Sequence, residues 1–115
     1  MNDPHAVHAE TRHRREPRVR YVQRPNPALD VDGDSALLLD LSMHAIRLRE
    51  RGHRKSVGDS FHGYAWLRSG HLLEVDGRVL RVEDDEVTVE LTHELPVTMF
   101  AEERRAVDEG STTNV

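Results

Sequence analysis

The positions of apolar residues along the chain follow the short, alternating runs that are typical of β-strands. The leucine-rich run Leu37–Leu41 is long enough for a well-buried strand, and the alternating segment Ala45–Arg49 follows it. Upstream, Val19 and Tyr21 alternate with arginines and predict a first strand over residues 18–22. Residues 23–35 carry prolines, a glycine and aspartates, and we expect them to form a loop.

The second half of the chain continues this alternation. Residues 61–67 place small and apolar side chains on one face and two large aromatic ones on the other. Asp76-Gly77, between the apolar runs of residues 72–82, predicts a β-hairpin, and residues 87–91 predict the last strand. Short strands separated by turns at this spacing favour a closed or nearly closed barrel.

A single helix is predicted near the end of the chain, over Pro96–Gly110, because proline suits a first helical turn and glycine suits a stop. Val97, Phe100 and Val107 form an apolar stripe, and the charged residues 102–105 are expected to face away from it. We expect the stripe to cover the barrel. The predicted fold class is therefore all-β: a small antiparallel six-stranded barrel with a C-terminal α-helix.

Charge is distributed unevenly over the 115 residues, which are too few for more than one sizeable domain. The formal net charge is −5, but residues 1–24 hold six arginines against three carboxylates, so this arm carries +3 and the remainder −8. A basic arm on an acidic body favours a local site for an anion over a broad basic surface. We therefore expect no DNA or RNA partner.

Several classes of site have no support in the sequence. Disulfides and thiolate chemistry are excluded because the chain has no cysteine. The histidines of residues 1–13 and the alternating aspartates of residues 30–34 lack the remaining pattern of a metal site, and no nucleophile–base pair stands out. The prediction is a non-enzyme with no cofactor, no metal and no catalytic residues.

The expected location is cytoplasmic, without membrane insertion. No apolar run approaches the roughly 18 residues of a membrane span, and the N-terminus lacks the apolar region of a signal peptide.

Two groups of polar residues are candidates for a binding site. Arg14 and Arg18 lie four apart on either side of Pro17 and can grip one ligand from two directions. Asp40 and Ser42 lie two apart, so in an extended chain an acceptor and a donor point to the same face. The alternative for this second pair is a turn, because both residue types readily bond to their own backbone.

Both groups match a known pattern. An Arg-x-x-x-Arg pair ahead of a first strand, followed further along by Asp-x-Ser-x-x-Gly, is the signature of PilZ domains, small β-barrels that bind the bacterial second messenger cyclic di-GMP. Here the first reads RREPR (Arg14–Arg18) and the second DLSMHA (Asp40–Ala45), so the chain resembles a PilZ domain from about Arg12 to Val107. It departs from that pattern at Ala45, where the family has glycine.

The resemblance implies a non-catalytic receptor or effector domain that binds cyclic di-GMP and relays its level to an unidentified protein partner. Arg14 and Arg18 would clamp phosphate and guanine, with Arg15 as a second candidate for the phosphate, since guanidinium forks onto both. Asp40 and Ser42 would meet the opposite guanine edge. The implied ligand-binding residues are Arg14, Arg15, Arg18, Asp40, Ser42 and Ala45, the last permitting close backbone approach.

The domain boundaries that follow are a mobile arm over residues 1–13, a PilZ-like domain over residues 14–110 and a tail over residues 111–115. The main alternative is a degenerate barrel of the same fold that binds no cyclic di-GMP and acts only through protein contacts. A third and less favoured hypothesis is a nucleic-acid binder that uses the arginine-rich N-terminal arm. The downstream partner, the oligomeric state and the number of ligand molecules per site stay open.

Overall fold

A computed structural model of the chain describes residues 16–22 and 25–112, with side chains as far as Glu109. The predicted arm over residues 1–13 lies outside the described residues, as do Arg14 and Arg15. No helix in the described part of the chain is long and apolar enough to span a bilayer.

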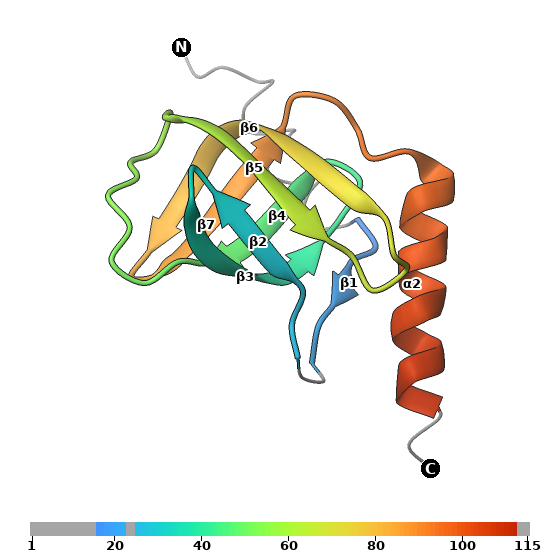
Figure 1. Ribbon diagram of the computed structural model, residues 1–115. Coiled ribbons are helices and arrows are strands. Elements are labelled where there is room, and N and C mark those ends of the chain that lie inside the picture. Colours follow the sequence, from blue (N-terminus) through green and yellow to red (C-terminus); the bar gives the residue numbers. More distant parts are fainter. Residues whose placement is uncertain (1–15, 23–24, 113–115) are drawn as a thin grey trace.

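Six antiparallel strands close into a barrel, which confirms the predicted fold class (Figure 1). Around the barrel the order is β3, β2, β5, β6, β7, β4, and β4 pairs back to β3. A seventh strand, β1, lies outside this ring, and the helix α2 follows the last strand. The bounds are β1 Val19–Arg20, β2 Ala28–Val31, β3 Asp34–Leu41, β4 Ala45–Arg49, β5 Ser60–Trp66, β6 Leu72–Glu83, β7 Glu86–Leu91 and α2 Val97–Thr112.

Side chains that alternate along the strands fill the interior, because successive residues of a strand point to opposite faces. Leu38 and Leu48 are fully buried, as are Val87 and Val89. On β5 the predicted apolar face is likewise buried, and its outer face exposes the aromatic side chains. The core is formed by Leu29, Val31, Ala36, Leu38, Leu41, Ile46, Leu48, Phe61, Ala65, Leu73, Val75, Val79, Val87 and Val89, with Val19, Tyr21, Leu67, Leu95, Phe100 and Val107.

The predicted loop over residues 23–35 is wrong in part, because it contains β2 and the start of β3. These strands form a hairpin in which Val31 pairs with Asp34 around a two-residue turn, Asp32-Gly33. Both turn residues have positive φ, 52° and 88°, the conformation that Asp-Gly adopts in tight hairpins. Asp32-Gly33 is therefore an Asp-Gly pair that does form a hairpin turn.

The hairpin predicted at Asp76-Gly77 is also wrong, because both residues lie within the single twelve-residue strand β6. Gly77 pairs with Phe61 of β5 on one side and with Leu91 of β7 on the other. A Cβ built on Gly77 would lie 2.0 Å from the carbonyl oxygen of Glu90. Glycine is needed here for close approach of β7 and not for a turn.

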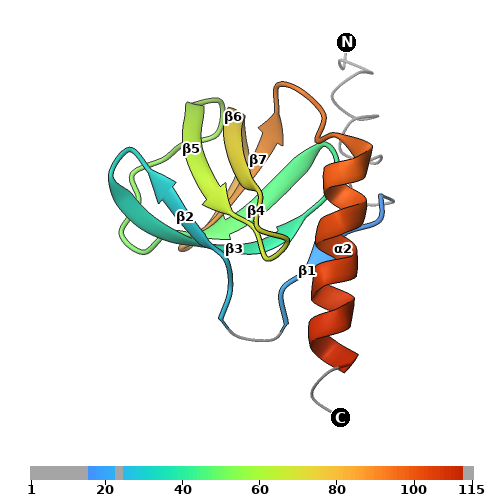
Figure 2. The same cartoon turned by 45° about the vertical axis from the view of Figure 1, so that its right-hand side comes forward.

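The helix α2 packs beside β1 and the turn between β5 and β6, along one side of the barrel (Figure 2). It runs from Val97 to Thr112, beyond the predicted stop at Gly110. Val97, predicted to be in the apolar stripe, is 65% exposed. Glu103, predicted to face away, is fully buried between Phe100 and Val107 on the packed face.

Glu103 is satisfied by three donors, which explains why a carboxylate is tolerated there. The hydroxyl of Tyr21 donates to its Oε2 at 2.6 Å, and the backbone N–H groups of Arg68 and Ser69 donate at 3.0 and 2.8 Å. The carboxylate thus joins α2 to the residue after β1 and to the β5–β6 turn. Burial, then the hydrogen bond and charge of Glu103, raise the pKa of Tyr21 well above its ordinary value.

Replacing Gly77 by Ala is expected to lower the free energy of unfolding by about 1–3 kcal/mol or more, because the new methyl group must push β7 away. Its matched control is Asp76→Ala, at an exposed neighbour in the same strand, which should cost no more than about 0.5 kcal/mol. Urea unfolding of both variants measures the difference. Equal stability of the two would show that the close contact at Gly77 carries no constraint.

Alkaline pH is expected to destabilise the fold through Tyr21. The pKa of Tyr21 is raised in the folded state, so its contribution to the free energy of unfolding is complete below about pH 10. As the pH rises further this contribution is lost, and the free energy of unfolding falls by up to about 1.4 kcal/mol per pH unit. Urea unfolding between pH 8 and 11 should show that the free energy of unfolding falls less steeply with pH in Tyr21→Phe than in the wild type. Tyr64→Phe, which alters an exposed tyrosine, is the control and should keep most of the wild-type fall; an unchanged profile in Tyr21→Phe would contradict this role.

Candidate functional site

The predicted site residues that the structure describes lie where β1, β3 and β4 meet. β1 pairs with the end of β3, with Arg20 opposite Asp40, so the segment ahead of β1 runs beside the second motif. The structure brings Arg18 into contact with Asp40, at 3.7 Å between Nη1 and Oδ1. Residues separated by β2 and most of β3 therefore come together at one outer edge of the barrel.

Asp40 reaches that outer face because of a β-bulge. Leu38 pairs with Leu48, but Asp40 pairs with Arg47, so Leu39 is an extra residue on β3. Without it, alternation would turn Asp40 into the core on the same side as Leu38. The bulge instead places Asp40 beside the outward side chain of Arg47, where it is only 4% exposed.

Arg47 is the closest partner of the buried carboxylate, with Nε donating to Oδ2 of Asp40 at 2.7 Å. Its Nη1 donates to Glu86 of β7, also at 2.7 Å, and Glu86 accepts from Arg49 at 3.2 Å. Burial lowers the pKa of Arg47, but the hydrogen bond and charge of Asp40, followed by those of Glu86, outweigh it, so the net shift is upward. Together with Arg18, these residues form a ladder of alternating charges that runs from the segment ahead of β1 across β3, β4 and β7. The ladder residues are Arg18, Asp40, Arg47, Glu86 and Arg49.

Ser42 closes the turn between β3 and β4. Its buried Oγ donates to the carbonyl of Ala45 at 3.2 Å and accepts from the N–H groups of Ala45 and His44 at 3.1 and 3.4 Å. One donor and two acceptor positions are all that a hydroxyl offers. The structure therefore gives Ser42 the turn role that the sequence left open, and its contact with a ligand stays a prediction.

Ala45 is buried and begins β4, paired with Glu90 of β7. A glycine at this point of the motif can serve a positive φ or close approach of a ligand. The described non-glycine residues with positive φ are Asp32 and Asp84, so the backbone at Ala45 does not require glycine. Any handicap from its methyl group must therefore lie on the ligand side.

A second contact links the two motifs. His44, in the turn, lies between the carboxylates of Glu16 and Glu94, one at each ring nitrogen. Glu16 belongs to the first motif and His44 to the second. Together with the Arg18–Asp40 contact, this pair holds the segment before β1 against the β3–β4 turn.

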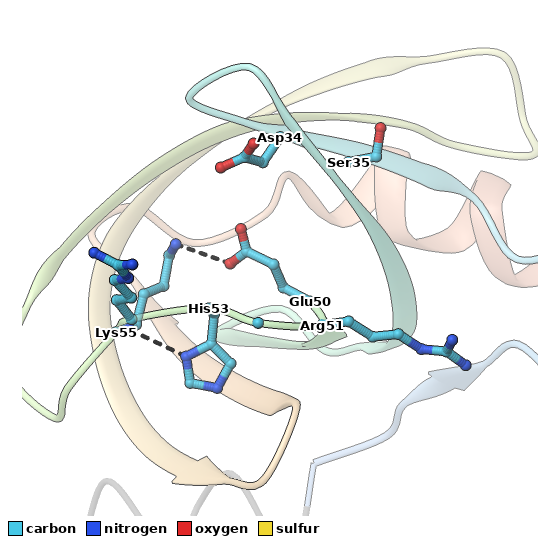
Figure 3. A pocket seen from close by; sticks show the side chains of 8 residues that line it. Asp34, Ser35, Glu50, Arg51, His53 and Lys55 are labelled. Carbon is cyan, nitrogen blue, oxygen red and sulfur yellow. Dashed lines mark hydrogen bonds and ion pairs between the residues drawn. The ribbon is translucent and has the colours of Figure 1, made fainter.

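A polar cavity of about 480 Å³ lies on the loop after β4 (Figure 3). Glu50 and Lys55 point toward one another inside it, with 2.8 Å between Oε1 and Nζ. His53 donates from Nε2 to the carbonyl of Asp84 and accepts at Nδ1 from the backbone of Lys55, which sets its tautomer. The bond from His53 to Asp84 joins the loop to the turn between β6 and β7, and Glu50 is buried.

A second hollow, of about 520 Å³, runs along the outer side of β3. It combines the apolar side chains of Leu37 and Leu39 with the guanidinium groups of Arg49 and Arg51. Arg49 also belongs to the ladder, so the hollow adjoins the Asp40 site, which we define as the ladder residues together with Glu16 and His44. Its remaining lining residues are Pro25, Asn26, Ser35 and Ala36.

Sequence reasoning did not single out Arg47 or Glu86. The available signal was the Arg-Leu-Arg alternation of residues 47–49, which places two guanidinium groups on the outer face of one strand. Their pairing with Asp40 depends on the bulge at Leu39, which has no marker in the local sequence. Among the described residues, no group of three or more His, Asp or Glu side chains is arranged to hold a metal ion.

Comparison with known proteins supports the fold alone. No protein-family model matches the chain, and a search of curated proteins found no match. The crystal structure of an uncharacterised Legionella protein, Lpg0364, is similar, with a TM-score of 0.51 and 10% sequence identity. The similarity covers 85% of this chain and 97% of that one.

Removing Arg47 is expected to destabilise the protein because it leaves the buried carboxylate of Asp40 without its closest donor. Loss of one partner of a fully buried pair costs about 3–5 kcal/mol; since Arg47 is partly exposed, we expect about 1–3 kcal/mol for Arg47→Ala. Arg78→Ala, at an exposed position on β6, is the matched control and should change stability by less than about 0.5 kcal/mol. Chemical denaturation of the two variants measures the difference in the free energy of unfolding. Equal stability would mean that the buried carboxylate of Asp40 does not need Arg47 as a donor.

Proposed function

We propose that this protein is a cyclic di-GMP receptor domain of the PilZ type, acting without catalysis and passing the ligand signal to a protein partner. The observation that carries the proposal is the meeting of two distant motifs at one place. Arg18 contacts Asp40, and Glu16 contacts His44, across the junction of β1 with the β3–β4 turn. Residues that resemble the two halves of a ligand site are thus neighbours in space.

The distances suggest different roles for Arg47 and Arg18, the two arginines that contact Asp40. Arg47 holds the carboxylate at 2.7 Å, whereas Arg18 lies 3.7 Å from it and keeps part of its side chain exposed. A phosphate or guanine edge can draw Arg18 into a bidentate contact while Arg47 continues to compensate the buried charge. Arg14 and Arg15, which lie outside the described residues, are proposed to complete this clamp.

The hollow along β3 offers room for the rest of such a ligand. Leu37 and Leu39 would pack against a purine face, and the guanidinium groups of Arg49 and Arg51 would stack on a base or pair with a phosphate. Cyclic di-GMP combines two flat bases with two anionic groups, so it suits a surface of alternating apolar and guanidinium side chains. This surface suits a long polyanion such as DNA or RNA less well, because the carboxylates of the ladder interrupt its positive charge.

A degenerate barrel that binds only protein is the second candidate, and Ser42 favours it. Its hydroxyl is fully used within the β3–β4 turn and has no capacity left for guanine unless the turn opens. The two candidates differ in whether cyclic di-GMP binds at all.

Calorimetric titration with cyclic di-GMP tests the proposal. Saturable binding to the wild type is expected, and Arg18→Ala should weaken it at least tenfold because a charge-assisted fork contributes roughly 1.5–3 kcal/mol. Arg18→Lys should also bind poorly, since an ammonium group cannot fork.

The matched control is again Arg78→Ala, an arginine outside the site, which should bind like the wild type. GMP and a short DNA duplex serve as competing ligands. A wild type that binds no cyclic di-GMP would favour the degenerate barrel, whereas stronger binding of DNA than of cyclic di-GMP would favour the nucleic-acid reading. Full affinity in Arg18→Ala would remove Arg18 from the site.

A further inference from the structure

The outer wall formed by β5 and β6 exposes three large hydrophobic side chains together. Trp66 and Leu72 are 52% and 53% exposed, and Tyr64 is 37% exposed. Single exposed apolar residues are ordinary, but a contiguous group on a rigid sheet is typical of a contact surface. β5 and β6 lie side by side here, and β2 separates them from β3, so this wall is distinct from the Asp40 site (Figure 1).

Strand register places these side chains next to each other. Trp66 is directly opposite Leu72, and Tyr64 is opposite Glu74. Partners that face one another across a sheet lie on the same side of it, with Cβ atoms about 4.5–5.5 Å apart. The ring of His62 packs edge-on against Tyr64, 5.1 Å between centroids. The outer wall, defined as His62, Tyr64, Trp66, Leu72, Glu74 and Asp76, is therefore one continuous surface.

Carboxylates surround the aromatic rings on this wall. Asp30 of β2 and Glu74 of β6 pair with Tyr64 from its two sides, and Asp76 pairs with His62. The negative charge of Glu74, followed by its hydrogen bond to the hydroxyl, raises the pKa of the exposed Tyr64. On the described part of these strands, the arginines on the outer face of β6 lie beyond Asp76: Arg78 follows it directly, and Arg81 lies further along, next to Glu83. Negative charge therefore predominates around exposed aromatic rings.

We infer that this outer wall is a docking surface for a basic peptide segment of a partner protein, one that presents both arginine and aliphatic side chains on the same face. Guanidinium groups would lie over Trp66 and Tyr64 and pair with Glu74, because cations are attracted to both ring faces and carboxylates. The aliphatic residues would pack on Leu72 and Trp66. This inference does not depend on cyclic di-GMP binding, since it uses none of the residues of the Asp40 site.

Other occupants fit the wall less well. Nucleic acid would bring phosphates against Asp30, Glu74 and Asp76, which would repel them. A neutral oligosaccharide could stack on the aromatic rings but would leave the surrounding negative charge without a counterpart. Electrostatic complementarity therefore selects the basic segment.

Trp66 reports directly on binding because it is the one tryptophan in the chain. The experiment titrates the protein with a synthetic octapeptide in which pairs of arginines alternate with pairs of leucines, so that each face of the extended peptide carries both residue types. Its glutamate–leucine counterpart is titrated in the same way, and Trp66 emission is recorded. A saturable shift with the arginine peptide and none with the glutamate peptide is expected. Cellohexaose is the neutral sugar probe, and a shift caused by it without a response to the arginine peptide would overturn the inference.

Calorimetry with matched variants separates a defined surface from general attraction to an acidic protein. Trp66→Ala and Glu74→Lys should each weaken binding of the arginine peptide at least tenfold. Glu83→Lys makes the same change in net charge at the far end of β6, where the side chain is 70% exposed, and should stay within twofold of the wild type. Equal losses in Glu74→Lys and Glu83→Lys, or full binding in Trp66→Ala, would overturn the inference.

Thermal unfolding of each variant must match the wild type, so that a loss of binding reports on the surface. Trp66→Phe gives a second check, because an aromatic ring at this position should retain more affinity than alanine. Loss of cyclic di-GMP binding in Arg18→Ala with an intact response to the arginine peptide would show that the two sites are separate.

Discussion

A carboxylate that a β-bulge turns out of the core is the feature on which the proposed site depends. Leu39 is the extra residue of that bulge, and it moves Asp40 from the interior to the side of Arg47. β1 pairs with this end of β3, with Arg20 opposite Asp40, and Arg18 approaches the carboxylate from the segment ahead of β1. Pairing of β1 with β3, burial of Asp40 and its contact with Arg18 are therefore linked, because a change in the bulge would alter all three.

The alternation of apolar residues was sufficient to predict the barrel and helix, but not every turn. The chain contains two Asp-Gly pairs: Asp32-Gly33 forms a tight hairpin turn, while Asp76-Gly77 lies inside a long strand. Local sequence cannot separate them, because the difference is the backbone of β7 passing within 2.0 Å of where a Cβ on Gly77 would lie. Tertiary contacts decided which pair became the turn.

The same limit applies to charged residues. Glu103 stands in a run of charged residues that pattern analysis assigns to solvent, yet it is buried because Tyr21 and two backbone N–H groups converge on it. Arg18 and Asp40 could be named from the sequence because they resemble a known motif. Arg47 and Glu86 could not, since their role depends on which strands pair and on where the register shifts.

NMR is the sharpest test of whether the junction of β1 with the β3–β4 turn binds cyclic di-GMP. Backbone amide and arginine Nε–Hε resonances would be followed during a titration of the isotopically labelled protein with cyclic di-GMP. We expect saturable shifts centred on residues 16–20 and 40–47, including the Nε–Hε signals of Arg18 and Arg47, with Trp66 unaffected. No shifts at saturating ligand, or shifts centred elsewhere on the barrel, would contradict it.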